Sequence, residues 1–174
     1  MHGYNGLMCR EIRLAGVPKR ISSLSQQVDA FVKSIGGSTP IYSILVANNG
    51  IAAVKFIRSI RKWAFTTFGN DKAISLVAMA THMDIKSNAE HIHMADQFVE
   101  VPGGGSAENY GNVKLIGQIA SQAAVDAVWP GWYSPNQPPR YSYLLTYERV
   151  EVGGVGHCLA VPCSMLACQL QSRH

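Results

Sequence analysis

The fold is decided by a short stretch that reads Ile41-Tyr42-Ser43-Ile44-Leu45-Val46-Ala47-Asn48-Asn49-Gly50. Its first seven residues are mostly apolar and include β-branched side chains, as in a strand that is buried on both faces of a sheet. Residues 48–50 are a turn signal, and residues 51–68 repeat apolar side chains at helical spacing. Residues 69–71, which begin with a glycine, are expected to end that helix. The stretch therefore predicts a strand, a tight turn and an amphipathic helix.

The same alternation continues along the chain. Further strands are expected at 74–80, 97–101 and 125–129, and further helices at 84–94 and 109–123. This β-α-β-α-β-α-β order predicts an α/β fold, namely a Rossmann-like parallel sheet with flanking helices and right-handed crossovers. Ligands of such sheets bind at the carboxyl ends of the strands. Those ends are expected at residues 48–50, 81–84, 102–106 and 130–132.

The chain divides into three zones. Residues 1–40 form an N-terminal extension with a short amphipathic helix expected at 25–35, closed by a Gly-Gly-Ser-Thr-Pro break. Residues 41–132 form the α/β domain. Residues 133–174 open with three prolines in five residues, at 135–139, and break again at the glycines of 153–156. Residues 141–152 could form a strand or hairpin. We expect the irregular tail of residues 133–174 as a whole to be largely mobile and not to dock as an integral layer of the domain.

Composition excludes several classes of function. The hydrophobic fraction of 47% and the charged fraction of 15% suit a globular core, and the net charge of +4 is scattered rather than gathered in an aromatic-lined stripe. We therefore expect no nucleic-acid partner and, without an apolar run of about 20 residues, no membrane span.

We also expect no metal site. Cysteines five residues apart near the C-terminus do not match zinc spacing, and two histidines two apart, His91 and His93, point to opposite sides of a helix.

Two turns are candidate anion sites. Asn48, Asn49 and Gly50 lie between a strand and a helix, where free amide groups at the helix N-terminus could face a phosphate. The alternative is a tight turn in which Gly50 permits a close approach, since neither a dinucleotide fingerprint nor a P-loop is present. The second candidate comprises Gly103, Gly104 and Gly105, with a flexible turn as the alternative.

A third candidate lies at the expected end of the last strand. Ligands of a parallel sheet bind at the carboxyl ends of its strands, and this position is occupied by Trp129, Pro130, Gly131 and Trp132. The two tryptophans could form a stacking wall, or they could be core packing followed by a turn. No catalytic residue can be nominated, because no nucleophile and base stand at a spacing that brings them together. The residues alone thus lead to an α/β domain with candidate ligand positions.

Several collinear motifs resemble those of one family. They read ILVANNGIAAVKFIRS at 44–59, VAMAT at 77–81, NAEHI at 88–92, ADQFVEVPGG at 95–104 and VDAVWPGW at 125–132. Together they are similar to the N-terminal part of the biotin carboxylase domain, a pre-ATP-grasp subdomain, and the final Trp-Pro-Gly-Trp resembles the multidomain eukaryotic acetyl-CoA carboxylases. The resemblance implies that the complete enzyme uses biotin, ATP and Mg²⁺ or Mn²⁺ to carboxylate biotin and then acetyl-CoA, giving malonyl-CoA for fatty acid biosynthesis.

The departures from the family also carry expectations. After Trp132 the family continues with Gly-His-Ala-Ser-Glu-Asn and then the ATP-grasp region, whereas Tyr133 begins unrelated sequence, as in a truncated transcript, a retained intron or a gene-model error. His82 and Met83 replace a usual Pro-Glu pair, a surface change that should leave the fold intact. The family's ligand-binding residues lie mostly in the absent region, so none is carried over.

These departures imply that the α/β domain is an incomplete carboxylase fragment, inactive alone and without cofactors of its own. Its expected partners are the rest of the carboxylase or a full-length carboxylase, and its expected compartment is the cytoplasm, or the plastid if the source is a plant. Two other interpretations stay open. The chain could be an inactive interaction partner of the full-length enzyme, or an unrelated nucleotide-binding α/β module.

Overall fold

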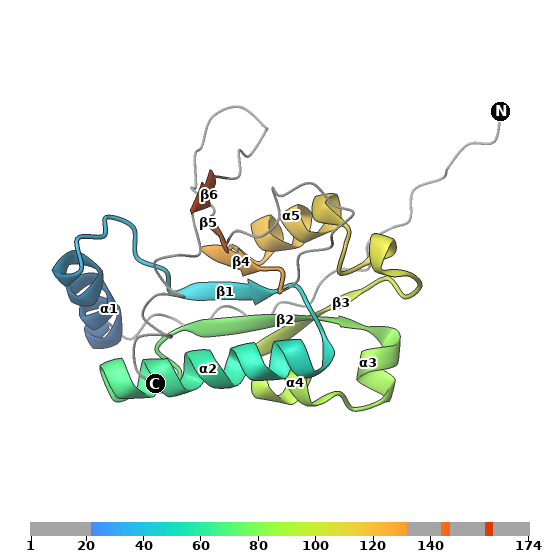
Figure 1. The fold of residues 1–174 in the computed structure, drawn as a ribbon, viewed down its shortest axis with the longest axis horizontal. Helices are drawn as coiled ribbons and strands as arrows, with labels where there is room; N and C mark the ends of the chain where they lie inside the picture. Colours follow the sequence, from blue (N-terminus) through green and yellow to red (C-terminus); the bar gives the residue numbers. More distant parts are fainter. Residues whose placement is uncertain (1–21, 132–143, 147–158, 162–174) are drawn as a thin grey trace.

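The computed structural model describes residues 22–131, 144–146 and 159–161 (Figure 1). Six strands form one sheet in the order β3-β2-β1-β4-β5-β6. The helices and strands are α1 (Ser22–Ser34), β1 (Ser43–Val46), α2 (Gly50–Phe68), β2 (Ser75–Thr81), α3 (His82–Lys86), α4 (Glu90–Met94), β3 (Gln97–Val101), the 3₁₀ helix η1 (Ser106–Glu108), α5 (Val113–Gln122), β4 (Ala127–Trp129), β5 (Leu144–Thr146) and β6 (Leu159–Val161).

The first four strands are parallel, as the sequence predicted. β1 lies in the centre, with β2 on one side and β4 on the other, and β3 pairs with β2. This arrangement places the turns after β1, β2, β3 and β4 at one edge of the sheet. No helix in the described part of the chain is long and apolar enough to cross a bilayer.

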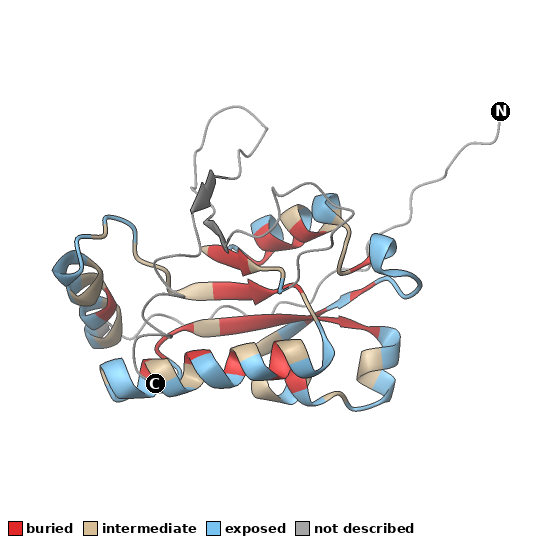
Figure 2. Ribbon diagram, viewed as in Figure 1, coloured by how far each residue is buried: buried red, intermediate tan, exposed pale blue. Residues whose placement is uncertain are grey.

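The central strands bury both of their faces (Figure 2). Leu45 and Ala47 of the β1 segment pack in the same cluster as Ile116 and Ile119 of α5. The alternate residues of β1 pack on the other face, in the cluster that also contains α2 side chains; this second cluster is made by Ile44, Val46, Ala53, Ile57, Ile60, Ile74, Leu76 and Ala127. A side-chain period of two therefore explains why residues 41–47 read as a continuous apolar run.

α2 begins and ends where the turn residues predicted. Gly69 follows the helix with φ 69° and donates its backbone N–H to the Phe65 carbonyl, a left-handed cap that suits glycine. α1 covers the C-terminal part of α2, where Phe31 makes edge-to-face contacts with Trp63 and Phe68 at ring distances of 5.8 and 5.5 Å. The expected helix at 25–35 is thus present, and these aromatic contacts hold it against the domain.

Two helix predictions were wrong in extent. The helix expected at 84–94 is two short helices, because Asn88 has φ 56° and interrupts the helical path. The helix expected at 109–123 begins only at Val113, because the Asn112 side chain accepts a hydrogen bond from Leu115 N–H and caps the helix there. Asn109 is used instead to close the preceding loop.

Residues of the tail lengthen the sheet. β5 pairs antiparallel with β4, and β6 pairs antiparallel with β5. β5 falls within the strand or hairpin expected at 141–152. The two strands continue the sheet sideways and add no layer on either face. The rest of residues 133–174 lies outside the described residues, so the expected mobility of the tail stays a prediction.

Candidate functional site at the carboxyl edge of the sheet

The ends of β1 and β4 are tied together. Ala47 N–H donates to the Trp129 carbonyl at 2.8 Å, and the Asn48 side-chain amide donates to the Pro130 carbonyl at 2.9 Å. Gly131 has φ 80°, and a Cβ at this position would overlap the Asn48 amide. The glycine is therefore required both by its backbone conformation and by the close approach of Asn48.

Trp129 is part of the packing of α2. Its ring stacks on Phe56 with centroids 4.1 Å apart and an interplanar angle of 7°. Both rings are partly buried against the core cluster on the α2 face. Trp132, the other tryptophan of the candidate stacking wall, lies outside the described residues, so the wall itself stays a prediction.

Asp84 joins the ends of β1 and β2. Its carboxylate accepts hydrogen bonds from the Thr81 backbone N–H at 2.9 Å, from the Thr81 hydroxyl and, at 3.3 Å, from the Asn49 side-chain amide. Thr81 in turn accepts from Asp84 N–H, which makes a capping box at the start of α3. The carboxylate thus completes the capping box of one helix, whose N-cap is Thr81, and bridges to the turn before another.

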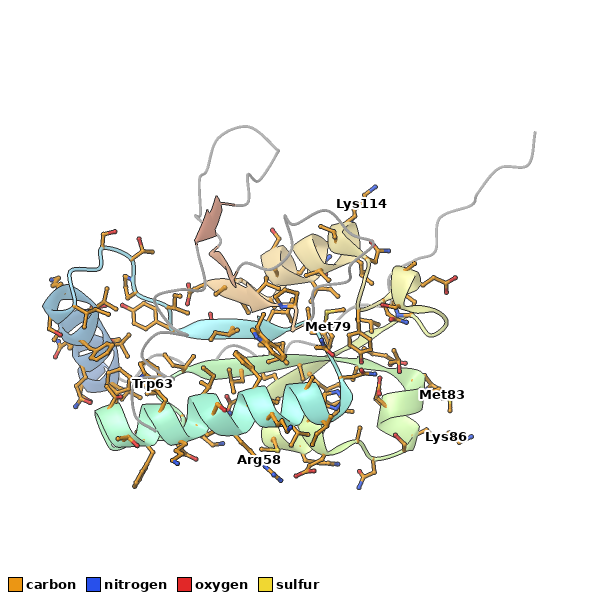
Figure 3. The ribbon with its side chains drawn as sticks, in the orientation of Figure 1. Arg58, Trp63, Met79, Met83, Lys86 and Lys114 are labelled. Carbon is orange, nitrogen blue, oxygen red and sulfur yellow. The ribbon has the colours of Figure 1, made fainter. Side chains whose placement is uncertain are left out.

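The end of β3 joins the same network through Tyr110. The Tyr110 hydroxyl donates to Asp84 at 2.7 Å and also lies 3.3 Å from the carbonyl of Met79, a residue of β2 that is labelled in Figure 3. Tyr110 N–H donates to the Asn109 side-chain oxygen at 2.7 Å. The Asn109 amide then donates to the carbonyls of Pro102 and Gly104 at 3.2 and 3.4 Å. Side chains therefore link the ends of β1, β2 and β3 in one series, and Asn48 joins β1 to β4.

The ionisation of this network follows from its contacts. Burial alone would raise the pKa of Asp84, but the hydrogen bonds from Thr81, Tyr110 and Asn49 outweigh burial and leave its pKa below the ordinary value of 3.8. Burial, and then the neighbouring Asp84 carboxylate, raise the pKa of Tyr110. Asp84 is accordingly a charged acceptor and Tyr110 a neutral donor at neutral pH.

The two candidate anion turns lie at the same edge but make separate contacts. Asn49 N–H donates to the Asn48 side chain, and the Asn49 amide faces the Asp84 carboxylate, so negative charge already lies beside the first turn. Gly104 has φ 99°, and its missing Cβ leaves room for the Glu108 carboxylate. These contacts account for the turns without a ligand. No contact tests anion binding itself, and that interpretation stays a prediction.

The two histidines on α4 occupy different environments. His91 is 0% exposed, its Nδ1 has no hydrogen-bond partner, and its Nε2 lies 3.4 Å from the Met79 carbonyl. His93 is exposed, and its Nε2 lies 2.6 Å from the Asn88 side-chain oxygen. The described residues contain no group of three His, Cys, Asp or Glu that could hold a metal ion.

Sequence reasoning placed residues 81–84 at this edge but nominated none of the three residues that organise it, namely Asp84, Asn109 and Tyr110. One signal was readable. Thr81 followed three residues later by Asp84 is a capping-box pattern, which predicts a helix start after a strand. Nothing in the local sequence around Tyr110 indicates that its hydroxyl reaches a carboxylate 26 positions away.

The fold and the site define a class of protein, namely an α/β domain with a parallel sheet whose loops are linked at the carboxyl edge. Residues 40–148 match the family described as "Biotin carboxylase, N-terminal domain", and the chain belongs to that family. Among the relatives, the chain is 61% identical over 120 residues to acetyl-CoA carboxylase 1 of Oryza sativa subsp. japonica, covering 69% of this chain and 5% of the relative. It is 55% identical over 126 residues to the acetyl-CoA carboxylase of Saccharomyces cerevisiae, covering 72% and 6%.

A solved structure gives a further comparison. The biotin carboxylase domain of Hydrogenobacter thermophilus 2-oxoglutarate carboxylase, in complex with ADP, magnesium and bicarbonate, is 27% identical. The match covers 55% of this chain and 18% of that chain, with a TM-score of 0.43. The resemblance drawn from the sequence motifs, to multidomain acetyl-CoA carboxylases, is confirmed by the curated relatives. The chain spans about one twentieth of the length of those relatives.

Proposed function

We propose that this chain supplies the N-terminal, parallel-sheet part of the biotin carboxylase domain of an acetyl-CoA carboxylase. The observation that carries the proposal is the 61% identity to a plant acetyl-CoA carboxylase. The family match at 40–148 supports it, because that range includes all four parallel strands. It also disfavours the interpretation as an unrelated nucleotide-binding module.

In the complete enzyme the proposed chemistry is a ligase reaction. ATP would transfer its γ-phosphoryl group to bicarbonate, which gives carboxyphosphate and releases ADP, and Mg²⁺ or Mn²⁺ would screen the phosphates. The carboxyl group would pass to biotin with release of phosphate, and then to acetyl-CoA, giving malonyl-CoA for fatty acid biosynthesis. We assign none of these steps to residues of this chain.

The isolated chain is proposed to be inactive and to bind none of these cofactors productively. Phosphoryl transfer requires metal-binding carboxylates and cations placed around the γ-phosphate. The carboxylate best placed at the ligand edge is Asp84, and it already accepts hydrogen bonds from Thr81, Tyr110 and Asn49. Among the described residues no group of three His, Cys, Asp or Glu could hold a metal ion together, so these residues do not fit the metal that the family uses.

The proposed partner is the rest of a carboxylase, either as separate polypeptide or as the full-length enzyme. The relatives support this, because in them the matched segment is a small part of a much longer chain. An inactive interaction partner of the full-length enzyme is the second candidate, supported by the same observation. The proposed compartment is the cytoplasm, with the plastid as the alternative for a plant source, and a fluorescent fusion imaged in cells distinguishes them.

A phosphate-release assay tests the proposed inactivity. Purified chain is incubated with ATP, Mg²⁺, bicarbonate and free biotin, and a heat-killed sample serves as the control. We expect equal phosphate release from both. Release above the control that depends on bicarbonate and magnesium would show that the chain carries the chemistry itself and would overturn this part of the proposal.

A further inference from the structure

The turn that leads from β1 to α2 contains an asparagine followed by a glycine, Asn49 and Gly50 (Figure 1). Both residues are exposed. Asparagine is a thermolabile residue, because the backbone nitrogen of the next residue can attack its side-chain amide carbon. A glycine at the next position has no Cβ, so its nitrogen is accessible to that carbon. The pair therefore has the composition that favours this intramolecular reaction.

The attacking nitrogen is not held by the protein. α2 begins at Gly50, and the first N–H groups of a helix have no acceptor within the helix. No described residue accepts a hydrogen bond from Gly50 N–H, and a Cβ built on Gly50 would meet nothing within 4 Å. The positive end of the helix dipole stabilises negative charge at this position, which favours loss of the proton from the nitrogen. Gly50 N is thus available as a nucleophile.

The side chain that would be attacked is held at one atom only. Asn49 Nδ2 donates to Asp84 at 3.3 Å. Asn49 Oδ1 accepts from no described residue, because the Asn49 side chain does not cap α2. The amide carbon is therefore not fixed by a second contact and can turn toward Gly50 N.

The other asparagines that the structure describes differ in both respects. None of them precedes a glycine. In each, Oδ1 takes part in a hydrogen bond that fixes the amide, and these pairs are Asn48 with Asn49 N, Asn70 with Lys72 N, Asn88 with His93 Nε2, Asn109 with Tyr110 N, and Asn112 with Leu115 N. At Asn48 and Asn109 the donor is the same nitrogen that would have to attack. The structure therefore singles out Asn49.

We propose that Asn49 is a site of spontaneous modification, at which the asparagine is converted into aspartate and isoaspartate with water as the co-reactant. Gly50 N forms a bond to Asn49 Cγ and the bond from Cγ to Nδ2 breaks. The proton of Gly50 N leaves with Nδ2 as ammonia, which leaves a cyclic imide. Water then adds to one of the two imide carbonyls. Opening at one carbonyl gives aspartate, and opening at the other gives isoaspartate.

The modification changes the carboxyl edge of the sheet. The hydrogen bond from Asn49 to Asp84 is lost, and a second carboxylate takes the place of the donor, where like charges repel. In the isoaspartate form the main chain between β1 and α2 is also longer by one carbon. The proposal does not depend on the proposed carboxylase function, because it rests on the chemistry of the turn alone.

Peptide mapping of the full 174-residue chain tests the proposal. The chain is incubated at neutral pH in isotopically labelled water, and mass spectrometry follows the conversion of each asparagine with time. We expect Asn49 to take up label roughly tenfold faster than the other described asparagines. Asn5, which also precedes a glycine and lies outside the described residues, is the internal reference for the conditions. Methylation by protein isoaspartyl methyltransferase should detect isoaspartate at position 49.

Two variants separate the glycine from the hydrogen bonds. Gly50→Ala should slow the conversion of Asn49 roughly tenfold and leave that of Asn5 unchanged. Asp71→Gly is the matched control, because it places a glycine after Asn70, whose Oδ1 is held by Lys72 N–H. Asn70 should then still react several-fold more slowly than Asn49. Gly50 has φ 57°, so alanine is strained there, and Asp71→Gly carries the test where circular dichroism shows that Gly50→Ala is unfolded.

Three outcomes overturn the proposal. Conversion of Asn5 without conversion of Asn49 would mean that the folded turn protects the asparagine. Aspartate without isoaspartate at position 49 would mean that water hydrolyses the amide directly, with no imide. Conversion of Asn70 in Asp71→Gly as fast as that of Asn49 would mean that the free carbonyl and the free N–H of the turn contribute nothing.

Discussion

Arg58 and Arg61 lie three positions apart on α2, but the ion pairs that they form should differ several-fold in their contribution to the free energy of unfolding. Arg61 and its partner Asp96 have side chains that are 13% and 14% exposed, with Nη2 2.7 Å from Oδ2. Arg58 and its partner Glu90 are 61% and 58% exposed. We therefore compare Arg61→Met with Arg58→Met, because the two substitutions remove the same group from the same helix in different dielectric surroundings.

The magnitude follows from what Arg61 leaves behind. Its guanidinium also donates to the carbonyls of Asp71, Ile74 and Met94 at 3.1, 3.0 and 3.4 Å, so with Asp96 four partners lose a charged donor. Breaking a buried pair by removing one partner costs about 3–5 kcal/mol. Lys72, 3.4 Å from the other Asp96 oxygen, retains some compensation, so we expect about 3 kcal/mol for Arg61→Met. The exposed pair should contribute about 0–1 kcal/mol.

Urea denaturation followed by far-UV circular dichroism measures the difference. With a slope of about 2 kcal/mol per molar urea, Arg61→Met should lower the midpoint by about 1.5 M and Arg58→Met by less than about 0.5 M. Adding Asp96→Asn to Arg61→Met should recover part of the loss, because it removes the unpaired charge. Equal midpoints for the two arginine variants would refute the reasoning that burial decides the contribution of these ion pairs.

Three other predictions concern the sheet edge, the buried histidine and the tail. Gly131→Ala should destabilise the chain by about 1–3 kcal/mol because of its left-handed backbone, whereas Gly117→Ala, in open space within α5, should be neutral or stabilising by up to about 1 kcal/mol, as thermal melts will show. Burial lowers the pKa of His91, so below its ordinary value of 6.5 the unfolded chain binds a proton that the folded chain does not, and stability should fall from pH 7 to pH 5. His91→Leu should reduce that slope, and an unchanged slope would contradict the assignment. Amide hydrogen exchange should show less protection across Tyr141–Leu170 than across Ile44–Ala47; equal protection would make the tail a folded part of the domain.

The parallel sheet could be predicted because its determinants are local. Residues 41–47 are mostly apolar. Alternate residues of β1 pack in the core cluster that contains α2 side chains and in the core cluster that contains α5 side chains. The ends of α2 were also readable, since a glycine with φ 69° follows it. Hydrophobic periodicity and turn chemistry are properties of neighbouring residues, so they survive in a single sequence.

The hydrogen-bond network at the carboxyl edge could not be predicted, because it depends on which loops the sheet brings together. Asn49 and Asp84 are 35 positions apart, and Tyr110 lies 26 positions beyond Asp84. The break at Asn88 was missed for a related reason. A polar residue inside a stretch with helical spacing does not by itself indicate a positive φ. That backbone conformation depends on how the two flanking helices pack.

The most direct test of the central claim is a reconstitution assay. A relative's biotin carboxylase domain that lacks the segment matched by residues 40–148 is mixed with this chain, and bicarbonate-dependent ATP hydrolysis is measured for the mixture and for each part alone. The account predicts that each part alone is inactive and that the mixture hydrolyses ATP in proportion to the limiting part. Activity of this chain alone, or a mixture that stays inactive although the two parts co-migrate in gel filtration, would contradict the claim that this sheet supplies the N-terminal part of a biotin carboxylase domain.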